Sequence, residues 1–221
     1  MNELLFIVYS CIVSITALIA LYLGKEALCA YIAVQAVLAN VFVLKQITLF
    51  GWQATASDVL IIGSVLGLNV LQEYFGRSAA MRAIWISFLL LVFYTIVSQF
   101  QIFFIPAASD TMHVHFQMLL QHMPRITIAS LATYLIVQHV DAFLYGAIKK
   151  KWQGRFLVGR NYLSIAVSQL LDTILFGFLG LYGLVDSLGQ ILVVSYCIKL
   201  AAIMLAGPFI ALSKKIIVKE Y

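Results

Sequence analysis

Long uncharged apolar runs decide what this chain can fold into. A bilayer core about 30 Å thick needs roughly 20 apolar residues per helix. Seven runs of about this length occupy residues 4–23, 27–46, 57–76, 82–105, 125–147, 161–185 and 188–212. In lipid, a helix satisfies all the backbone hydrogen bonds of such a segment. The sequence therefore predicts an all-α membrane protein, a single domain over residues 1–221 built as a bundle of seven transmembrane helices.

Composition excludes the soluble classes. Apolar residues make up 63% of the chain and charged residues only 10%, whereas soluble domains are near half apolar and a quarter charged. The net charge of +5 comes from short basic clusters between apolar runs. Nucleic-acid binding uses a continuous basic face instead, so we expect the lipid bilayer as a partner and no direct contact with nucleic acid.

Basic residues are distributed unequally between the two sets of connections. Positive charge accumulates on the cytoplasmic side of membrane proteins. One set of connections holds eleven basic residues, namely Lys25, Arg77, Arg82, Lys149, Lys150, Lys151, Arg155, Arg160, Lys214, Lys215 and Lys219. The other set holds only Lys45 and Arg125. This asymmetry predicts a multi-pass protein of a bacterial inner membrane, with its N-terminus outside and its C-terminus in the cytoplasm.

Two further segments carry a structural prediction. The connection 106–124 alternates polar and apolar residues, which favours a short helix on the membrane interface. Such a helix either caps the bundle or acts as a lid, and the sequence leaves both open. Gly63 and Gly67 form a Gly-x-x-x-Gly pattern that lets helices approach closely, and we expect it to pack against another helix of the same chain.

Ionisable residues inside the predicted spans need an explanation, because each costs about 2.5–3.5 kcal/mol near the bilayer centre. Asp172 and Lys199 lie near mid-depth, and Glu73 and Asp141 lie nearer the cytoplasmic ends. Residues three, four or seven apart share one helix face. Such faces collect Asn69, Gln72 and Glu73, then Thr127, Ser130, Tyr134, Gln138 and Asp141, then Asn161, Ser168, Gln169 and Asp172, and finally Tyr196 and Lys199.

Two interpretations of these polar faces stay open. In one, Asp172 and Lys199 form a satisfied buried pair, while the hydroxyl and amide groups join helices. In the other, the polar faces surround a cavity through which a polar ligand passes. Interhelical hydrogen bonds average well below about 1 kcal/mol in membranes, so stability alone accounts poorly for so many polar groups. We therefore favour the ligand.

Enzyme chemistry has little support. The chain lacks the nucleophile elbow of hydrolases, the metalloprotease His-Glu-x-x-His pattern and phosphate-binding glycine loops. An intramembrane enzyme using Asp141 and Asp172 would lack a third ligand. His113 and His115 form only a weak metal pattern. We expect no catalytic residues, no cofactor and no metal.

Four motifs resemble the bacterial queuosine precursor transporter family. They are Asn69-Val-Leu-Gln-Glu73-Tyr-Phe-Gly76, the run Arg125 to Ser130 followed by Gln138-x-x-Asp141, Ser168-Gln169-Leu-Leu-Asp172-Thr173, and Tyr196-x-x-Lys199. The resemblance implies uptake of a 7-deazaguanine, such as preQ0, preQ1 or queuine, for tRNA modification. Asn69 stands where the family usually has an aspartate, and the first span is an addition to six-helix members.

The chemistry of the motif residues suits this substrate class. A carboxylate can accept hydrogen bonds from ring N–H and amino groups while an amide or cation donates to the lactam oxygen. The candidate site contains Asp172 or Glu73 as the carboxylate, Gln169, Gln138, Lys199 or Arg125 as donors, Tyr134 or Tyr196 as stacking surfaces, Asp141 as a partner for a substrate amine, and Asn69. The alternative is a substrate-binding membrane subunit for a vitamin-like molecule that needs a separate ATPase. Homo-oligomerisation is left open.

Overall fold

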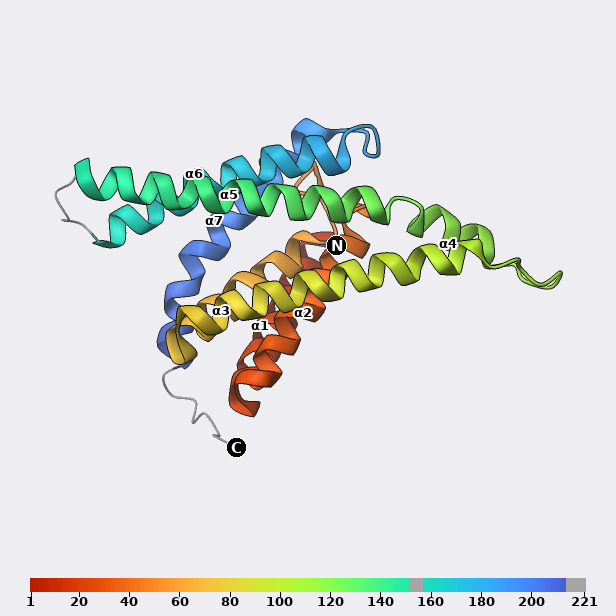
Figure 1. Cartoon of the computed structure of the whole chain (residues 1–221). Helices are drawn as coiled ribbons and strands as arrows, with labels where there is room; N and C mark the ends of the chain where they lie inside the picture. The colour runs from red at the N-terminus through yellow and green to blue at the C-terminus, as the bar shows by residue number, and fades with distance from the viewer. Residues whose placement is uncertain (152–156, 214–221) are drawn as a thin grey trace.

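The computed structural model describes residues 1–151 and 157–213, which form a mostly helical bundle (Figure 1). Its elements are α1 (Asn2–Leu23), α2 (Lys25–Phe42), β1 (Gln46–Leu49), β2 (Trp52–Thr55), α3 (Asp58–Phe103), α4 (His113–Leu120), α5 (Met123–Lys151), α6 (Leu157–Phe176), the π-helical turn η1 (Gly177–Leu181) and α7 (Leu188–Ser213). Helical backbone occupies most of each predicted span. In the described part of the chain, α1, α2 and α3 are long and apolar enough to cross a membrane.

A β-hairpin follows α2, and the sequence analysis missed it. The predicted second span reached residue 46, but α2 ends at Phe42 and β1 begins at Gln46. The strands pair antiparallel, with Leu49 opposite Trp52. Phe50 and Gly51, at the turn, both have positive φ, as a tight two-residue hairpin turn requires. The fold is therefore not purely α-helical. A Phe-Gly turn lacks the usual Asn-Gly signal, which explains the omission.

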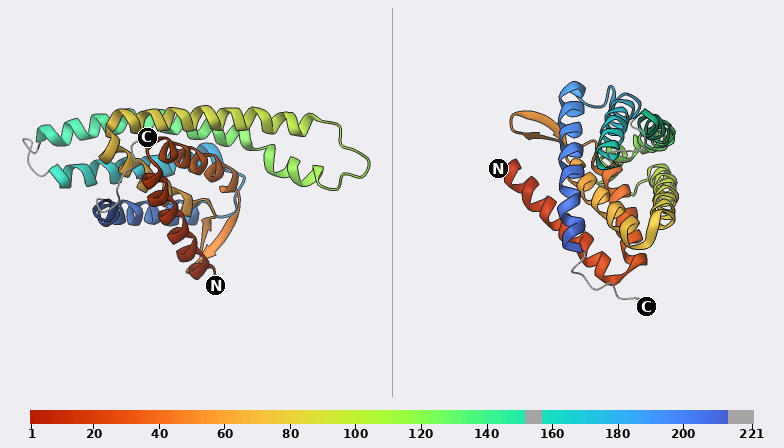
Figure 2. Two further views of the ribbon diagram at one scale, coloured as in Figure 1. Left: turned by 90° about the horizontal axis from the view of Figure 1, so that it is seen from below. Right: turned by 90° about the vertical axis from the view of Figure 1, so that its left-hand side faces the viewer.

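Gly76 divides α3 into two helical arms, residues 58–75 and 77–103. Its backbone angles, φ 82° and ψ 167°, interrupt the helix at this one residue, in a region that is essentially restricted to glycine. The predicted third and fourth spans are these two arms, and the connection expected at 77–81 is helical instead. The second arm and α5 run alongside each other, as two further views show (Figure 2).

Several connections meet at one end of the bundle, which we call the hairpin end. Asn2 donates to the Thr48 carbonyl at 3.0 Å, and the Gln53 N–H donates to the Gln190 side chain at 3.0 Å. The start of α1, the hairpin and the start of α7 are therefore neighbours. At the opposite end of α1, Leu21 and Leu28 share an apolar cluster with Ala79 of the second arm. Connections that the sequence predicts on the same side of the membrane are therefore neighbours in the fold.

The outer segment contains the short helix that the sequence predicts. This helix is α4, and Asp110 caps its start by accepting hydrogen bonds from the Met112 and His113 N–H groups at 2.8 and 3.2 Å. Leu120, at its end, is buried in a cluster with Met123 and Ile126 of α5. The helix is thus anchored to the bundle at its C-terminal end.

The Gly-x-x-x-Gly pattern packs within the chain, as predicted. A Cβ atom built on Gly63 would lie 2.1 Å from Val13 Cγ1 and 2.4 Å from the Tyr31 hydroxyl. One on Gly67 would lie 2.9 Å from Ile32 Cγ1. The Tyr31 hydroxyl also donates to the Val13 carbonyl at 2.8 Å. The first arm of α3 therefore contacts α1 and α2 through its glycine face.

Replacing Gly63 with alanine is expected to destabilise the protein by about 1–3 kcal/mol, the usual cost of overpacking. The added methyl group displaces Val13 and disturbs the Tyr31 hydrogen bond. Thermal unfolding in detergent measures the loss. Gly189→Ala is the matched control, because nothing lies within 4 Å of a Cβ at that position. Equal unfolding temperatures for the two variants would contradict the packing described above.

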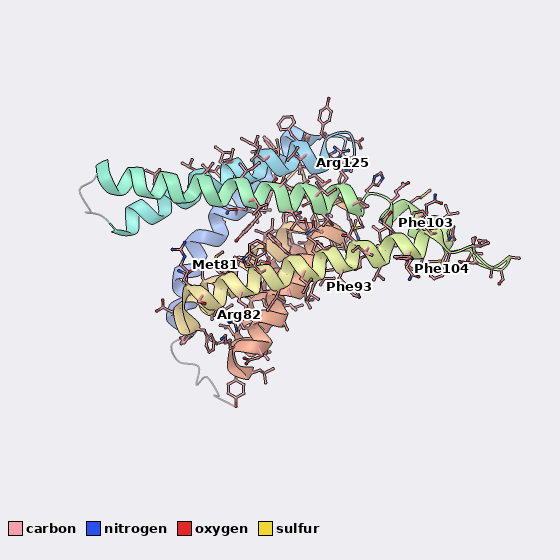
Figure 3. All side chains as sticks on the ribbon, in the orientation of Figure 1. Met81, Arg82, Phe93, Phe103, Phe104 and Arg125 are labelled. Carbon is pink, nitrogen blue, oxygen red and sulfur yellow. The ribbon has the colours of Figure 1, made fainter. Side chains whose placement is uncertain are left out.

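Large apolar side chains cover much of the outer surface. Phe93, Phe103 and Phe104 lie along and just beyond the second arm of α3 (Figure 3), and they are 62%, 78% and 64% exposed. The outer face of α1 likewise exposes Leu4, Ile12 and Ile19. Soluble monomers rarely expose apolar patches of this extent. A lipid environment removes the cost of exposing them, so this surface is that of a membrane protein.

Candidate functional site

A buried ion pair joins α6 to α7. The Lys199 ammonium group donates to Asp172 Oδ2 and, at 3.0 Å, to the Thr173 hydroxyl. The Thr173 hydroxyl in turn donates to the Gln169 carbonyl at 2.8 Å. Because its hydrogen is used in this bond, the hydroxyl oxygen of Thr173 faces Lys199 with its lone pairs. The side chain of Lys199 is only 8% exposed, whereas that of Asp172 is 30% exposed. The pair therefore has one partly open side, formed by the aspartate.

Each member of this pair has hydrogen-bonding capacity that no described residue uses. An ammonium group has three N–H donors, and Lys199 uses two of them on Asp172 and Thr173. Asp172 Oδ1 has no hydrogen-bond partner among the residues that the structure describes. An N–H donor of Lys199 and the acceptor atom Asp172 Oδ1 therefore lie side by side at a partly open position. This arrangement suits a planar ligand that has an acceptor and a donor next to each other on one edge.

Asp58 is a buried carboxylate that the sequence analysis did not single out. Its side chain is 1% exposed. Ser195 Oγ lies 2.8 Å from Oδ1 and 3.0 Å from Oδ2, and the Thr55 N–H donates to Oδ2 at 3.2 Å. In the sequence, an aspartate after Ser57 at the start of an apolar run has the pattern of an exposed helix N-terminus. Only the packing of α7 and the hairpin over this turn buries it.

The predicted polar face of α5 is used partly for helix packing. Thr127 hydrogen-bonds Thr95 of α3 at 2.6 Å, and Ser130 donates to Asn40 of α2 at 2.7 Å. Such contacts agree with the first of the two interpretations given above, in which hydroxyl and amide groups of the polar faces join helices. Tyr134 differs, because its hydroxyl is buried without a hydrogen-bond partner in the described part of the chain. Its ring meets Phe88 edge-on, with centroids 4.7 Å apart.

Arg125 binds the backbone of another connection. Its Nε donates to the Leu179 carbonyl at 3.0 Å and its second guanidinium nitrogen to the Tyr182 carbonyl at 2.7 Å. Both carbonyls lie at or just beyond η1, where a helix end leaves acceptors without intrahelical partners. Figure 3 shows Arg125 at the start of α5, beside this turn. Its contacts are therefore those of a cap that holds the α6–α7 connection to α5.

The other predicted site residues are spread over the bundle. Asn69 is half-buried and Glu73 is exposed, both on the first arm of α3. Gln169 is half-buried on α6, one turn before Thr173, and the Tyr196 hydroxyl donates to the Ala166 carbonyl at 3.2 Å. Gln138 and Asp141 lie on α5, but their side chains fall outside the described residues. Of the predicted set, Asp172 and Lys199 are the two whose side chains contact each other among the described residues.

Metal ligation finds no support in the parts of the chain that the structure describes, where no group of three or more His, Cys, Asp or Glu side chains is close enough to hold an ion. Ionisable groups buried inside an apolar helical bundle mark the paths of polar solutes or ions through membranes. Fold and site together define a multi-pass membrane protein of the transporter class.

Comparison with known proteins agrees with this class. Residues 55–213 match the family model described as "Putative vitamin uptake transporter", and the chain belongs to this family. A protein of Bacillus subtilis (strain 168), named "Probable queuosine precursor transporter", is 34% identical over 198 residues, which cover 88% of this chain and 86% of the relative. No solved structure matches the chain. The resemblance predicted from the motifs is confirmed, and the protein is a membrane transporter rather than an enzyme.

Proposed function

We propose that this protein imports a queuosine precursor of the 7-deazaguanine class, namely queuine, preQ1 or preQ0, for tRNA modification. The observation that carries the proposal is the Asp172–Lys199 pair, which leaves one acceptor atom and one N–H donor without a partner among the described residues. The name of the Bacillus subtilis relative supports the same substrate class.

The pair complements the polar edge of a deazaguanine. The lactam of this ring system has an N–H donor directly beside a carbonyl acceptor. Asp172 Oδ1 accepts from the ring N–H, while the third N–H of Lys199 donates to the lactam oxygen. Both bonds involve a charged partner, and such bonds are roughly twice as strong as neutral ones. Guanine, hypoxanthine and uracil present the same lactam edge, so the pair favours planar lactam bases over aliphatic solutes, and the name of the Bacillus subtilis relative supports the deazaguanine class among them.

The remaining candidates are assigned supporting roles. The Gln169 amide, one turn before Thr173, serves as a second donor or acceptor for the ring, and the rings of Tyr134 and Tyr196 serve as stacking surfaces. Gln138 extends the α5 face beyond Tyr134. Glu73 and Asp141 pair with the amine of preQ1 or queuine.

Asn69 and Arg125 complete the proposed set. Asn69 takes the place of an acidic group on the first arm, and Arg125 contributes by holding the α6–α7 connection. The proposed membrane topology has seven crossings, with α1 beginning outside. The hairpin end, which gathers the start of α1, the hairpin and the start of α7, is then the outer face.

Restored tRNA modification is the test of this function. Cells that lack queuosine synthesis and their own transporter are complemented with this chain and fed limiting queuine, preQ1 or preQ0 in turn, with host enzymes able to use each precursor. We expect queuosine to return in tRNA with at least one precursor. Asp172→Ala should abolish this return, while Asp110→Ala, at an exposed carboxylate just before α4, should not. No return with any precursor, despite membrane expression, would exclude the substrate class.

Purified protein distinguishes a complete transporter from a subunit that needs an ATPase. The chain alone, in liposomes, should move the accepted precursor. Binding without movement would instead favour the substrate-binding subunit.

A further inference from the structure

Asp58 and the proposed substrate pair contact neighbouring turns of the same face of α7. Ser195 and Lys199 are four residues apart on α7, so they share one helix face. Ser195 donates to the carboxylate of Asp58 at the start of α3, and Lys199 donates to that of Asp172 on α6. The polar face of α7 thus contacts two carboxylates from two different helices, through neighbouring turns.

The charges of this group do not balance. Lys199 already pairs with Asp172. Within the residues that the structure describes, no lysine or arginine forms an ion pair with Asp58, whose side chain is 1% exposed. Among the described residues, the buried carboxylate of Asp58 and the partly exposed carboxylate of Asp172 therefore share one cation, and a buried charge without a counter-charge is costly. Binding of one further positive charge at Asp58 would remove this imbalance.

Among the described residues, the elements around Asp58 bring no ion-pair partner for its carboxylate, and Lys45, whose carbonyl accepts from the Ala56 N–H at 2.8 Å, is exposed. The hairpin, residues 46–55, contains no charged residue. α1 and α2 bring the phenols Tyr9 and Tyr31, which pack with the cluster that contains the first turn of α3. Phenols are neutral at physiological pH. Lys199 lies one turn of α7 beyond Ser195 and is already paired with Asp172.

The distances favour a proton over a metal cation. Ser195 Oγ lies 2.8 and 3.0 Å from the two oxygens of Asp58, which are hydrogen-bond lengths. A sodium ion would have to separate these groups, whereas a proton needs no additional space. A hydroxyl can donate or accept, so Ser195 satisfies both the carboxylate and the carboxylic acid.

We propose that Asp58 carries the proton that couples to substrate uptake; this inference rests on the proposed transport function. One proton from the outer solution binds the Asp58 carboxylate, crosses with one substrate molecule and leaves Asp58 for the cytoplasm. Because Ser195 and Lys199 belong to one rigid helix, a shift of α7 that opens the Asp58 site also moves the lysine of the substrate pair. Proton binding and substrate release are thereby linked through α7.

Accumulation and exchange of substrate separate coupling from binding. The full chain is reconstituted in vesicles of phosphatidylethanolamine and phosphatidylglycerol, with labelled queuine, preQ1 and preQ0 each used as a probe. An inward gradient of one pH unit should drive about tenfold accumulation for each coupled proton. Asp58→Asn should abolish accumulation and keep the exchange of labelled for unlabelled substrate across the membrane. Asp186→Asn, the same change at an exposed carboxylate, should behave as wild type.

A second variant keeps the test decisive if Asp58→Asn does not fold. Ser195→Ala removes a donor to the carboxylate and retains the proton site. We expect proton-driven uptake to persist, with its half-maximal outer pH about one unit higher, because the hydrogen bond lost by the ionised form is roughly twice as strong as the one lost by the neutral acid. An unchanged pH profile in Ser195→Ala would overturn the assignment.

Three other results would also overturn it. The first is accumulation of substrate by Asp58→Asn. The second is exchange of substrate by wild-type protein without accumulation under the proton gradient. The third is accumulation driven by a sodium gradient instead. Wild-type protein that neither exchanges nor accumulates any of the three precursors is a different outcome, because it refutes the proposed function itself.

Discussion

Replacing Lys199 with methionine is expected to lower precursor uptake by at least about 100-fold. Methionine retains most of the volume of lysine but leaves Asp172 as an uncompensated carboxylate. The folded protein that remains lacks the charge-assisted hydrogen bonds proposed for the lactam, each of which contributes about 1.5–3 kcal/mol, and each 1.4 kcal/mol is a factor of ten in an equilibrium constant. The lost ammonium group also removes the proposed donor to the lactam oxygen. Initial uptake rates, normalised to the amount of folded protein, measure the effect.

The double variant Asp172→Asn, Lys199→Met separates stability from substrate binding. Neither residue is then charged, so thermal stability should return toward that of wild type, because a neutral replacement of a buried pair is often tolerated. Uptake should stay low, because the charged donor and acceptor are both gone. Lys45→Met, at an exposed lysine, is the control for loss of a positive charge. Normal uptake by the double variant would show that the pair serves only to hold α6 to α7.

Replacing Gly76 with valine is expected to remove most of the folded protein. The two arms of α3 reverse direction through the backbone of Gly76, at φ 82° and ψ 167°. Such strained conformations cost about 1–3 kcal/mol, and the branched Cβ of valine makes this region more unfavourable still. No atom lies within 4 Å of a Cβ built at this position, so the effect comes from the backbone alone. Yield of monodisperse protein and thermal unfolding in detergent measure it.

Ser78→Val is the matched control for Gly76→Val. It places the same side chain on an exposed helical position two residues later, where valine costs only a fraction of a kcal/mol. We expect wild-type yield and stability. A Gly76→Val protein as stable as this control would mean that the arms do not need the glycine conformation to reverse.

Helix positions were largely predictable because their signal is local. A run of apolar residues of sufficient length needs a helix in lipid wherever the neighbouring helices lie. The span predicted at 4–23 begins two residues after α1 begins and ends at the same residue. The span predicted at 188–212 begins with α7 and ends one residue before it. The exceptions were short-range features without a strong signal, namely the hairpin after α2 and the sharp reversal at Gly76.

Residues of the candidate site were less predictable, because burial and partners depend on distant segments. Periodicity placed Asp172 and Lys199 on polar faces, and their pairing was one of two interpretations. Asp58 has the sequence pattern of a surface helix start, yet Ser195, 137 residues further along the chain, meets its carboxylate. Arg125 belongs to a motif of the resemblance, but its contacts with Leu179 and Tyr182 come only from the fold of η1.

Apolar run length, the basic asymmetry and the motif residues by themselves determined a multi-pass membrane transporter and its family. These properties depend on how each segment partitions between water and lipid, which is a matter of local composition. Only the tertiary structure decided that α7 contacts the buried carboxylate of Asp58 and the partly exposed carboxylate of Asp172, with one lysine to serve both among the described residues. Charge balance is a property of groups that the fold brings together from α3, α6 and α7, so no segment considered alone could reveal it.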